Sequence, residues 1–92
     1  MTVTRGATTF DRVDYDADAD VLYLHVGDPE SATEFEESPE GHAIRFEALG
    51  RLVGVTVVGA KSLIEHGGRL VVTVPERLEL SATELRSIIQ AA

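Results

Sequence analysis

The sequence lacks cysteine and tryptophan, and only 5% of its residues are aromatic. Without cysteine the chain can form no disulfide, no thiolate metal site and no cysteine nucleophile. Long apolar runs are also missing. No segment approaches the roughly 18 apolar residues that a membrane-spanning helix needs, and the first ten residues hold no apolar run of signal-peptide length. We therefore expect a cytoplasmic protein with no membrane contact.

Basic residues are scarce, mainly in the first half of the chain. Eight Lys and Arg stand against sixteen Asp and Glu, which gives a net charge of −8. Residues 1–50 hold twelve acidic and three basic residues, whereas residues 51–92 hold four and five. A negative field of this kind repels nucleic-acid phosphate and favours basic partners, although it can also serve solubility alone. We expect no nucleic-acid binding by this chain alone.

Short β-rich runs bounded by turn residues dominate the pattern and predict strands. These runs cover residues 10–15, 21–26, 32–38, 42–47, 52–58 and 69–75. Residues 60–66 instead fit a short helix ended by two glycines, and a capping box at residues 81–84 opens a terminal helix. The prediction is an α+β fold, an antiparallel β-meander of four to five strands with a short helix and a C-terminal helix packed on one face. We expect one domain over residues 1–92, with residues 1–9 as a loose N-terminal tail.

Carboxylates at every second position open the stretch VDYDADADVLYLHV (residues 13–26), at Asp14, Asp16, Asp18 and Asp20. EF-hand calcium loops begin in this way, but they also need a glycine after the third ligand and a bidentate glutamate at the end of the loop. A loop that starts at Asp16 has neither, and its flanks are predicted as strands. We predict a turn whose carboxylates are solvated or accept hydrogen bonds from local amides. No metal and no other cofactor is expected.

The two stretches YDADADVLYLHV and GHAIRFEALGRLVGVTVVGA resemble the bacterial family called domain of unknown function 2283, over residues 13–60. The order and spacing of the matching positions agree with the family as well as their composition. These positions are Tyr15, Asp16, Asp20, Leu22, Tyr23, Gly41, Gly50, Arg51, Val53, Gly54 and Val55. This chain departs from the family where residues 47–49 (EAL) replace a second acidic turn, and it continues beyond the minimal family members. The resemblance implies a compact β-rich fold and genomic pairing with small RelE-like toxin-type proteins, but no catalytic residues.

Three histidines are the candidates for acid–base chemistry, namely His25, His42 and His66. No two of them have the His-x-x-x-His spacing of a helical metal site, and no further ligand lies close to such a pair in sequence. The serines lack the Gly-x-Ser-x-Gly context of a nucleophile elbow. We therefore expect structural histidines and a protein that is not an enzyme.

Two hypotheses about function remain. The first is an interaction module that binds a basic protein, in one form as the antitoxin-like partner of a RelE-like toxin. Its candidate contacts are Glu34, Glu36, Glu37 and Glu40, on the weakest predicted strand. The same glutamates are also typical of a solvated edge strand, whose charges prevent edge-to-edge pairing.

The second hypothesis is a small-molecule sensor or minor enzyme with a pocket between the sheet and a helix, near Tyr23, His25 and Arg45. Separately, residues 21–24 and 55–58 are apolar on both faces of their predicted strands, and such strands need cover on both sides. Two short helices are too few for this. We therefore predict a homodimer whose contact lies on the apolar strands.

Overall fold

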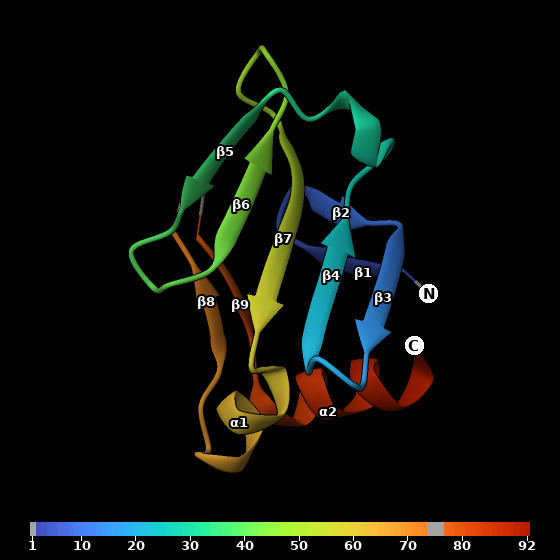
Figure 1. Ribbon diagram of the computed structural model, residues 1–92, viewed down its shortest axis with the longest axis vertical. Coiled ribbons are helices and arrows are strands. Elements are labelled where there is room, and N and C mark those ends of the chain that lie inside the picture. The colour runs from blue at the N-terminus through green and yellow to red at the C-terminus, as the bar shows by residue number, and fades with distance from the viewer. Residues whose placement is uncertain (1, 74–76) are drawn as a thin grey trace.

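The computed structural model describes residues 2–73 and 77–92, in which a five-stranded antiparallel sheet is the central element (Figure 1). Its strands, in spatial order, are β3 (Arg12–Asp16), β4 (Val21–His25), β7 (Leu52–Val58), β6 (Ala43–Phe46) and β5 (Glu34–Glu37). Two short hairpins pair β1 (Val3–Arg5) with β2 (Thr8–Phe10) and β8 (Leu70–Val72) with β9 (Leu78–Leu80). The helices are the 3-10 turn η1 (Pro29–Ser31), α1 (Ala60–Glu65) and α2 (Ala82–Ala91). This is the predicted α+β class.

The strand order differs from a simple meander, because β7 lies between β4 and β6. The chain leaves β4, passes through η1 along one end of the sheet and enters β5 at the far edge (Figure 1). Two backbone hydrogen bonds fix this connection, from the Val26 amide to the Val53 carbonyl and from the Thr33 amide to the Phe46 carbonyl, at 2.7 and 2.8 Å. Strand β5 therefore lies at an edge of the sheet, separated by β7 and β6 from β4, the strand that precedes it in the sequence.

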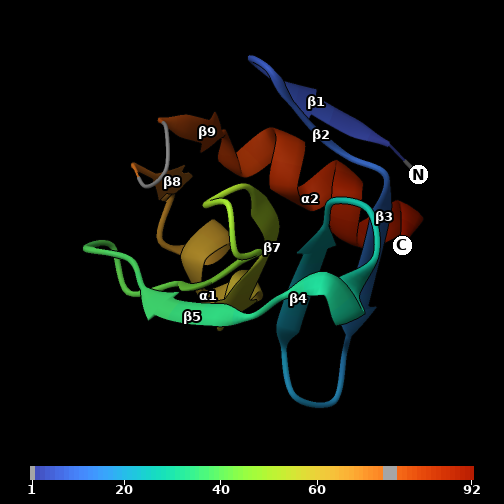
Figure 2. The same ribbon diagram turned by 90° about the horizontal axis from the view of Figure 1, so that it is seen from above.

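One face of the sheet carries the core, and α2 and both short hairpins cover it (Figure 2). Its buried side chains include Leu22 and Leu24 on β4 and Val55 and Val57 on β7. Leu85 of α2 belongs to the same cluster and has no exposed surface. At one end of the sheet η1 contacts β7, where Val53 is buried outside the core cluster, and no other element of the described residues covers the opposite face (Figures 1 and 2). The terminal helix thus packs on one face, as predicted.

The N-terminal segment forms a hairpin where the sequence predicted a loose tail. Val3 and Phe10 are paired across β1 and β2, and both are buried. The overlooked signal is the two-residue loop at Gly6, whose φ of +57° lies in the left-handed region that glycine adopts without strain. Arg5 then ties the hairpin to the rest of the molecule through an ion pair with Glu84 of α2.

The acidic turn between β3 and β4 is a structural turn, as predicted. The Asp16 carboxylate accepts hydrogen bonds from the amides of Asp18 and Ala19, at 3.1 and 3.2 Å. Asp20 accepts one from the Tyr15 hydroxyl at 2.6 Å and another from the Lys61 amide at 2.9 Å, so it joins the hairpin to α1. The hydrogen bond lowers the pKa of Asp20 and raises the pKa of Tyr15 to about 12. Among the described residues, no group of three or more potential ligands could hold a metal ion.

The C-terminal third follows its local signals closely. The predicted capping box at Ser81 and Glu84 is present, with each side chain bonded to the backbone amide of the other at 3.1 Å. The strand predicted over residues 69–75 is shorter in the structure, where β8 ends at Val72. It pairs with β9 and is not part of the main sheet. Its predicted end at Pro75 lies outside the described residues. No helix in residues 2–73 or 77–92 is long and apolar enough to cross a bilayer.

Candidate functional site

The predicted partner-binding glutamates lie together at the free edge of the sheet. Strand β5 bonds to β6 and is the last strand in the sheet order, and all four of its residues are exposed. Three of them are Glu34, Glu36 and Glu37. The fourth predicted residue, Glu40, lies in the following turn, where its carboxylate accepts a hydrogen bond from the Thr73 hydroxyl at 3.0 Å. The structure thus brings all four onto one edge.

A tight turn at residues 38–41 sets the end of this strand. Pro39 follows Ser38, whose carbonyl accepts a hydrogen bond from the Gly41 amide at 2.9 Å, and proline is favoured at this second position of a turn. Gly41 has a φ of +91°, which a residue with a side chain adopts only with strain. The buried Ser38 hydroxyl accepts a further hydrogen bond from the His42 amide at 3.0 Å. The β5–β6 hairpin is therefore firmly closed at the Glu40 end.

The charge of β5 is not balanced by neighbouring cations. Ion pairs in the described part of the chain involve Asp14, Glu47, Glu79 and Glu84, and none involves a glutamate of β5. The strand therefore presents three closely spaced carboxylates to solvent on a chain that is already strongly negative. A field of this sign attracts a basic surface and repels an acidic one.

A shallow apolar hollow lies beside the acidic edge, on the open face of the sheet. Phe35 of β5 and Val58 of β7 are 74% and 73% exposed, which is unusual for side chains of this size. Ala43 of β6 lies on the same face, and its small side chain leaves the space between them open. The hollow has a volume of about 360 Å³, and Glu36 and Glu37 are part of its lining.

The open face and the strand order explain why sequence reasoning missed the hollow. Phe35 is the one apolar residue of β5, and Val58 lies 23 positions further along the chain. Only the placement of β6 between β5 and β7 brings them to the lining of the same hollow. The one local signal was the apolar pair at residues 57–58, since adjacent residues of a strand point to opposite faces and one of the two had to face outward.

The predicted pocket residues are also brought together, but on the open face and not between the sheet and a helix. The ring of Tyr23 is parallel to that of His25, with centroids 6.2 Å apart. Arg45 Nη2 donates a hydrogen bond to His25 Nδ1 at 3.0 Å, and His25 Nε2 lies 3.4 Å from the Asp14 carboxylate. Because an arginine can only donate, neutral His25 carries its proton on Nε2, facing Asp14.

The side chains of Tyr23, His25, Arg45 and Asp14 contact one another in one cluster and leave no open site for a ligand. His25 is buried, and burial lowers its pKa, as does the positive charge of Arg45, against the opposing effect of Asp14. The guanidinium group of Arg45 lies over Gly54, where an added Cβ would come within 2.2 Å of Nη2. Gly54 thus marks a close approach of the Arg45 side chain to the backbone of β7. Both ring nitrogens of His25 have a neighbour in the cluster, so neither faces an open cavity.

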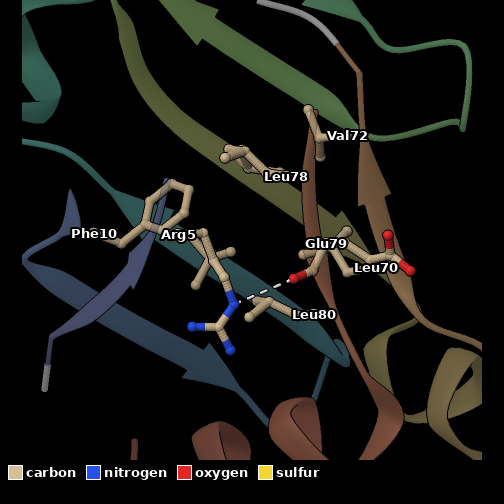
Figure 3. A pocket seen from close by; sticks show the side chains of 9 residues that line it. Arg5, Phe10, Leu70, Val72, Leu78, Glu79 and Leu80 are labelled. Atoms are coloured by element: carbon tan, nitrogen blue, oxygen red, sulfur yellow. Dashed lines mark hydrogen bonds between the residues drawn. The ribbon is translucent and has the colours of Figure 1, made fainter. Parts of the chain in front are cut away.

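A small apolar gap does lie on the covered side of the sheet (Figure 3). Its volume is about 10 Å³, which is close to the minimum for a single water molecule. Side chains from β2, β8 and β9 line it, among them Phe10, Leu70 and Leu80, and Arg5 Nε donates a hydrogen bond to the Glu79 carbonyl at its edge, at 3.3 Å. This gap is a packing feature of the core and has no room for a metabolite.

Comparison with known proteins gives one match. The sequence model of the family described as "Protein of unknown function (DUF2283)" matches residues 12–61, which is more than half of the chain. This region contains the whole five-stranded sheet, whereas the two short hairpins and α2 lie outside it. Searches of curated proteins and of solved structures each found no significant match.

Proposed function

We propose that this chain, which belongs to the DUF2283 family, is a non-catalytic interaction module that binds a basic protein through β5 and the turn that follows it. The observation that supports this most is the edge position of β5 together with its full exposure. Its three glutamates have no ion-pair partner among the described residues, so their charge is available to a partner. Glu40 extends the same acidic surface into the turn.

Charge of this kind acts first on the rate of association. Complementary fields raise association rate constants from about 10⁵–10⁶ M⁻¹s⁻¹ toward 10⁸–10⁹ M⁻¹s⁻¹ at low salt. Each exposed ion pair adds only about 0.2–1 kcal/mol, so the affinity must come from several pairs and from apolar contact. A small RelE-like toxin-type protein is the basic partner that the family resemblance implies. Covering the lysines and arginines that such a protein uses on RNA would neutralise it.

The same glutamates also protect an edge strand from pairing with other edges. Binding and protection make different predictions, because only binding requires a loss of affinity when the charges are removed. The test is calorimetric titration of the purified chain with the basic protein encoded beside it. The test variant is Glu34→Gln, Glu36→Gln and Glu37→Gln combined.

The control variant removes the same number of charges from exposed sites elsewhere, by Asp18→Asn, Glu30→Gln and Glu65→Gln. We expect the β5 variant to bind at least tenfold more weakly and the control variant to lose less than threefold. Affinity of the unmodified chain should fall steadily with added salt. Equal losses in both variants, or no complex at low salt, would contradict the proposal.

We also propose that two copies associate through the open face of the sheet. The uncovered face supports this. Strands β4 and β7 carry apolar residues on both faces, and such strands usually have both faces buried. Val21 and Tyr23 are half-buried there, and Arg12 and Asp14 form an ion pair on the same face, so the local charge is far smaller than the −8 of the whole chain. Two-fold dimers are the commonest oligomers.

Sedimentation velocity at low micromolar concentration tests this association. Val21→Asp should shift the protein to a monomer, because it places a carboxylate in the proposed apolar contact, whereas the similarly shaped Val21→Thr should shift it much less. A monomer for the unmodified chain would refute the dimer and leave the binding of a basic partner unaffected.

A further inference from the structure

We infer that the basic partner binds as an extended segment along the free edge of β5 and packs one apolar side chain against Phe35, at the edge of the hollow that Ala43 and Val58 line further in. This inference rests on the proposed function and adds the form and pattern of the bound segment, an apolar residue flanked on both sides by lysine or arginine. Two independent features of the structure point to the same pattern, the acidic edge and the apolar hollow beside it.

The edge of β5 is suited to strand addition. Only β6 pairs with it in the described part of the chain, so the backbone groups on its other side are open to a strand from another molecule. Proteins use such edges to bind extended peptides, in which backbone hydrogen bonds contribute affinity and alternate side chains contribute specificity. The closed turn at residues 38–41 and the backbone bond at Thr33 hold the strand in place at both ends.

The register of β5 sets the order of side chains in the bound segment. Phe35 and Glu37 project from the open face, since they pair with Arg45 and Ala43 of β6, and Glu34 and Glu36 project from the other face. A residue opposite Phe35 is therefore next to the hollow, while residues opposite the three glutamates meet carboxylates. Basic residues fit all three of these positions, because opposite charges across a strand pair are favourable. The bound segment therefore has an apolar residue with a basic residue on each side, whether it runs parallel or antiparallel to β5.

The edge of the hollow supplies an apolar contact, which adds affinity beyond that of the exposed ion pairs. Phe35 is about three-quarters exposed, so a leucine or valine opposite it can pack against its ring at the edge of the hollow. Burying an exposed apolar side chain of this size strengthens binding, because it removes apolar surface from water. The Glu37 side chain projects from the same face as the hollow and is placed to meet the charge of a flanking lysine.

A second copy of this chain does not fit the edge. Two β5 strands paired about a two-fold axis join residues that project from the same face, so Glu36 would lie opposite Glu34 or opposite its own copy. Like charges directly across a strand pair are destabilising, and both molecules carry a charge of −8. The acidic edge therefore selects a partner of the opposite charge.

The test uses two synthetic peptides that differ at one position, one containing Lys-Lys-Leu-Lys and the other Lys-Lys-Ser-Lys, each flanked by serines. Titration into the isotopically labelled full chain, followed by amide chemical shifts, gives both the affinity and the location of binding. We expect the leucine peptide to bind at least fivefold more tightly, with the largest shifts in β5. Equal affinity of the two peptides, or shifts centred elsewhere, would overturn the inference.

Matched variants locate the anchor. Phe35→Ser combined with Val58→Ser should remove the preference for leucine, whereas Leu49→Ser, at the other strongly exposed large apolar residue of the described chain, should keep it. If the glutamine variant of β5 loses the basic protein but neither peptide binds the unmodified chain, strand addition is wrong and the proposed function stands. If Phe35→Ser with Val58→Ser dissociates a dimer without changing peptide binding, a second copy occupies the hollow and the inference is likewise wrong.

Discussion

Shortening Leu85 to alanine tests whether helix α2 closes the core of this protein. The Leu85 side chain is 0% exposed and shares one apolar cluster with Leu22 and Leu24 of the sheet. The substitution removes apolar carbons whose transfer from water is worth about 0.8 kcal/mol per methylene, or about 2.4 kcal/mol in all. The cavity left behind adds about 24 cal/mol per Å³. The expected loss is therefore about 2–5 kcal/mol.

A loss of this size is large beside the total stability of a small domain, which is about 5–15 kcal/mol. The chain has no tryptophan, so urea unfolding is best followed by far-ultraviolet circular dichroism. With a denaturant dependence of about 1.5 kcal/mol per molar urea, the midpoint should fall by about 1.3–3.3 M. Gln90→Ala on the exposed side of the same helix is the control, and it should change stability by less than about 0.5 kcal/mol.

The refuting result is a Leu85→Ala protein with the stability of the control. It would mean that the sheet keeps its core without α2, and that the segments outside the family match are additions to an already stable unit. A protein that is unfolded even without urea would instead agree with a loss at the upper end of the range.

Two further predictions concern the close contacts of the open face and of the acidic turn. Gly54→Ala should destabilise the fold by about 1–3 kcal/mol in the same urea assay, because the new Cβ would meet the Arg45 guanidinium and the β4 backbone; unchanged stability would contradict that packing. In a Tyr23→Phe background, ultraviolet absorbance should show Tyr15 ionising near pH 12, and Asp20→Asn should lower that pKa. Since the folded pKa of Tyr15 is raised above the ordinary value of 10.0, its contribution to stability is complete below pH 10 and is lost as the pH rises toward 12; a midpoint near pH 10 would refute the contact.

Local features of this protein were predictable because neighbouring residues determine them. The capping box at Ser81 and the hydrogen bonds of Asp16 depend on atoms within a few positions of one another, so their sequence pattern is sufficient. The same holds for the long β-rich run of β7, whose predicted bounds agree with Leu52–Val58. The N-terminal hairpin was missed because a loop of two residues at Gly6 is a weak signal between strands of three residues.

By itself, the sequence determined the five strands of the main sheet, the two α-helices, the acidity of the first half and the position of three glutamates on one short strand. Only the tertiary structure decided that this strand is an edge, that Phe35 and Val58 line the same hollow, and that the predicted pocket residues lie on the face opposite the core. The physical reason is that strand order depends on contacts between segments far apart in the chain. The η1 connection carries β5 to the far edge, and the two hairpins and α2 bury one face of the sheet and leave the other free.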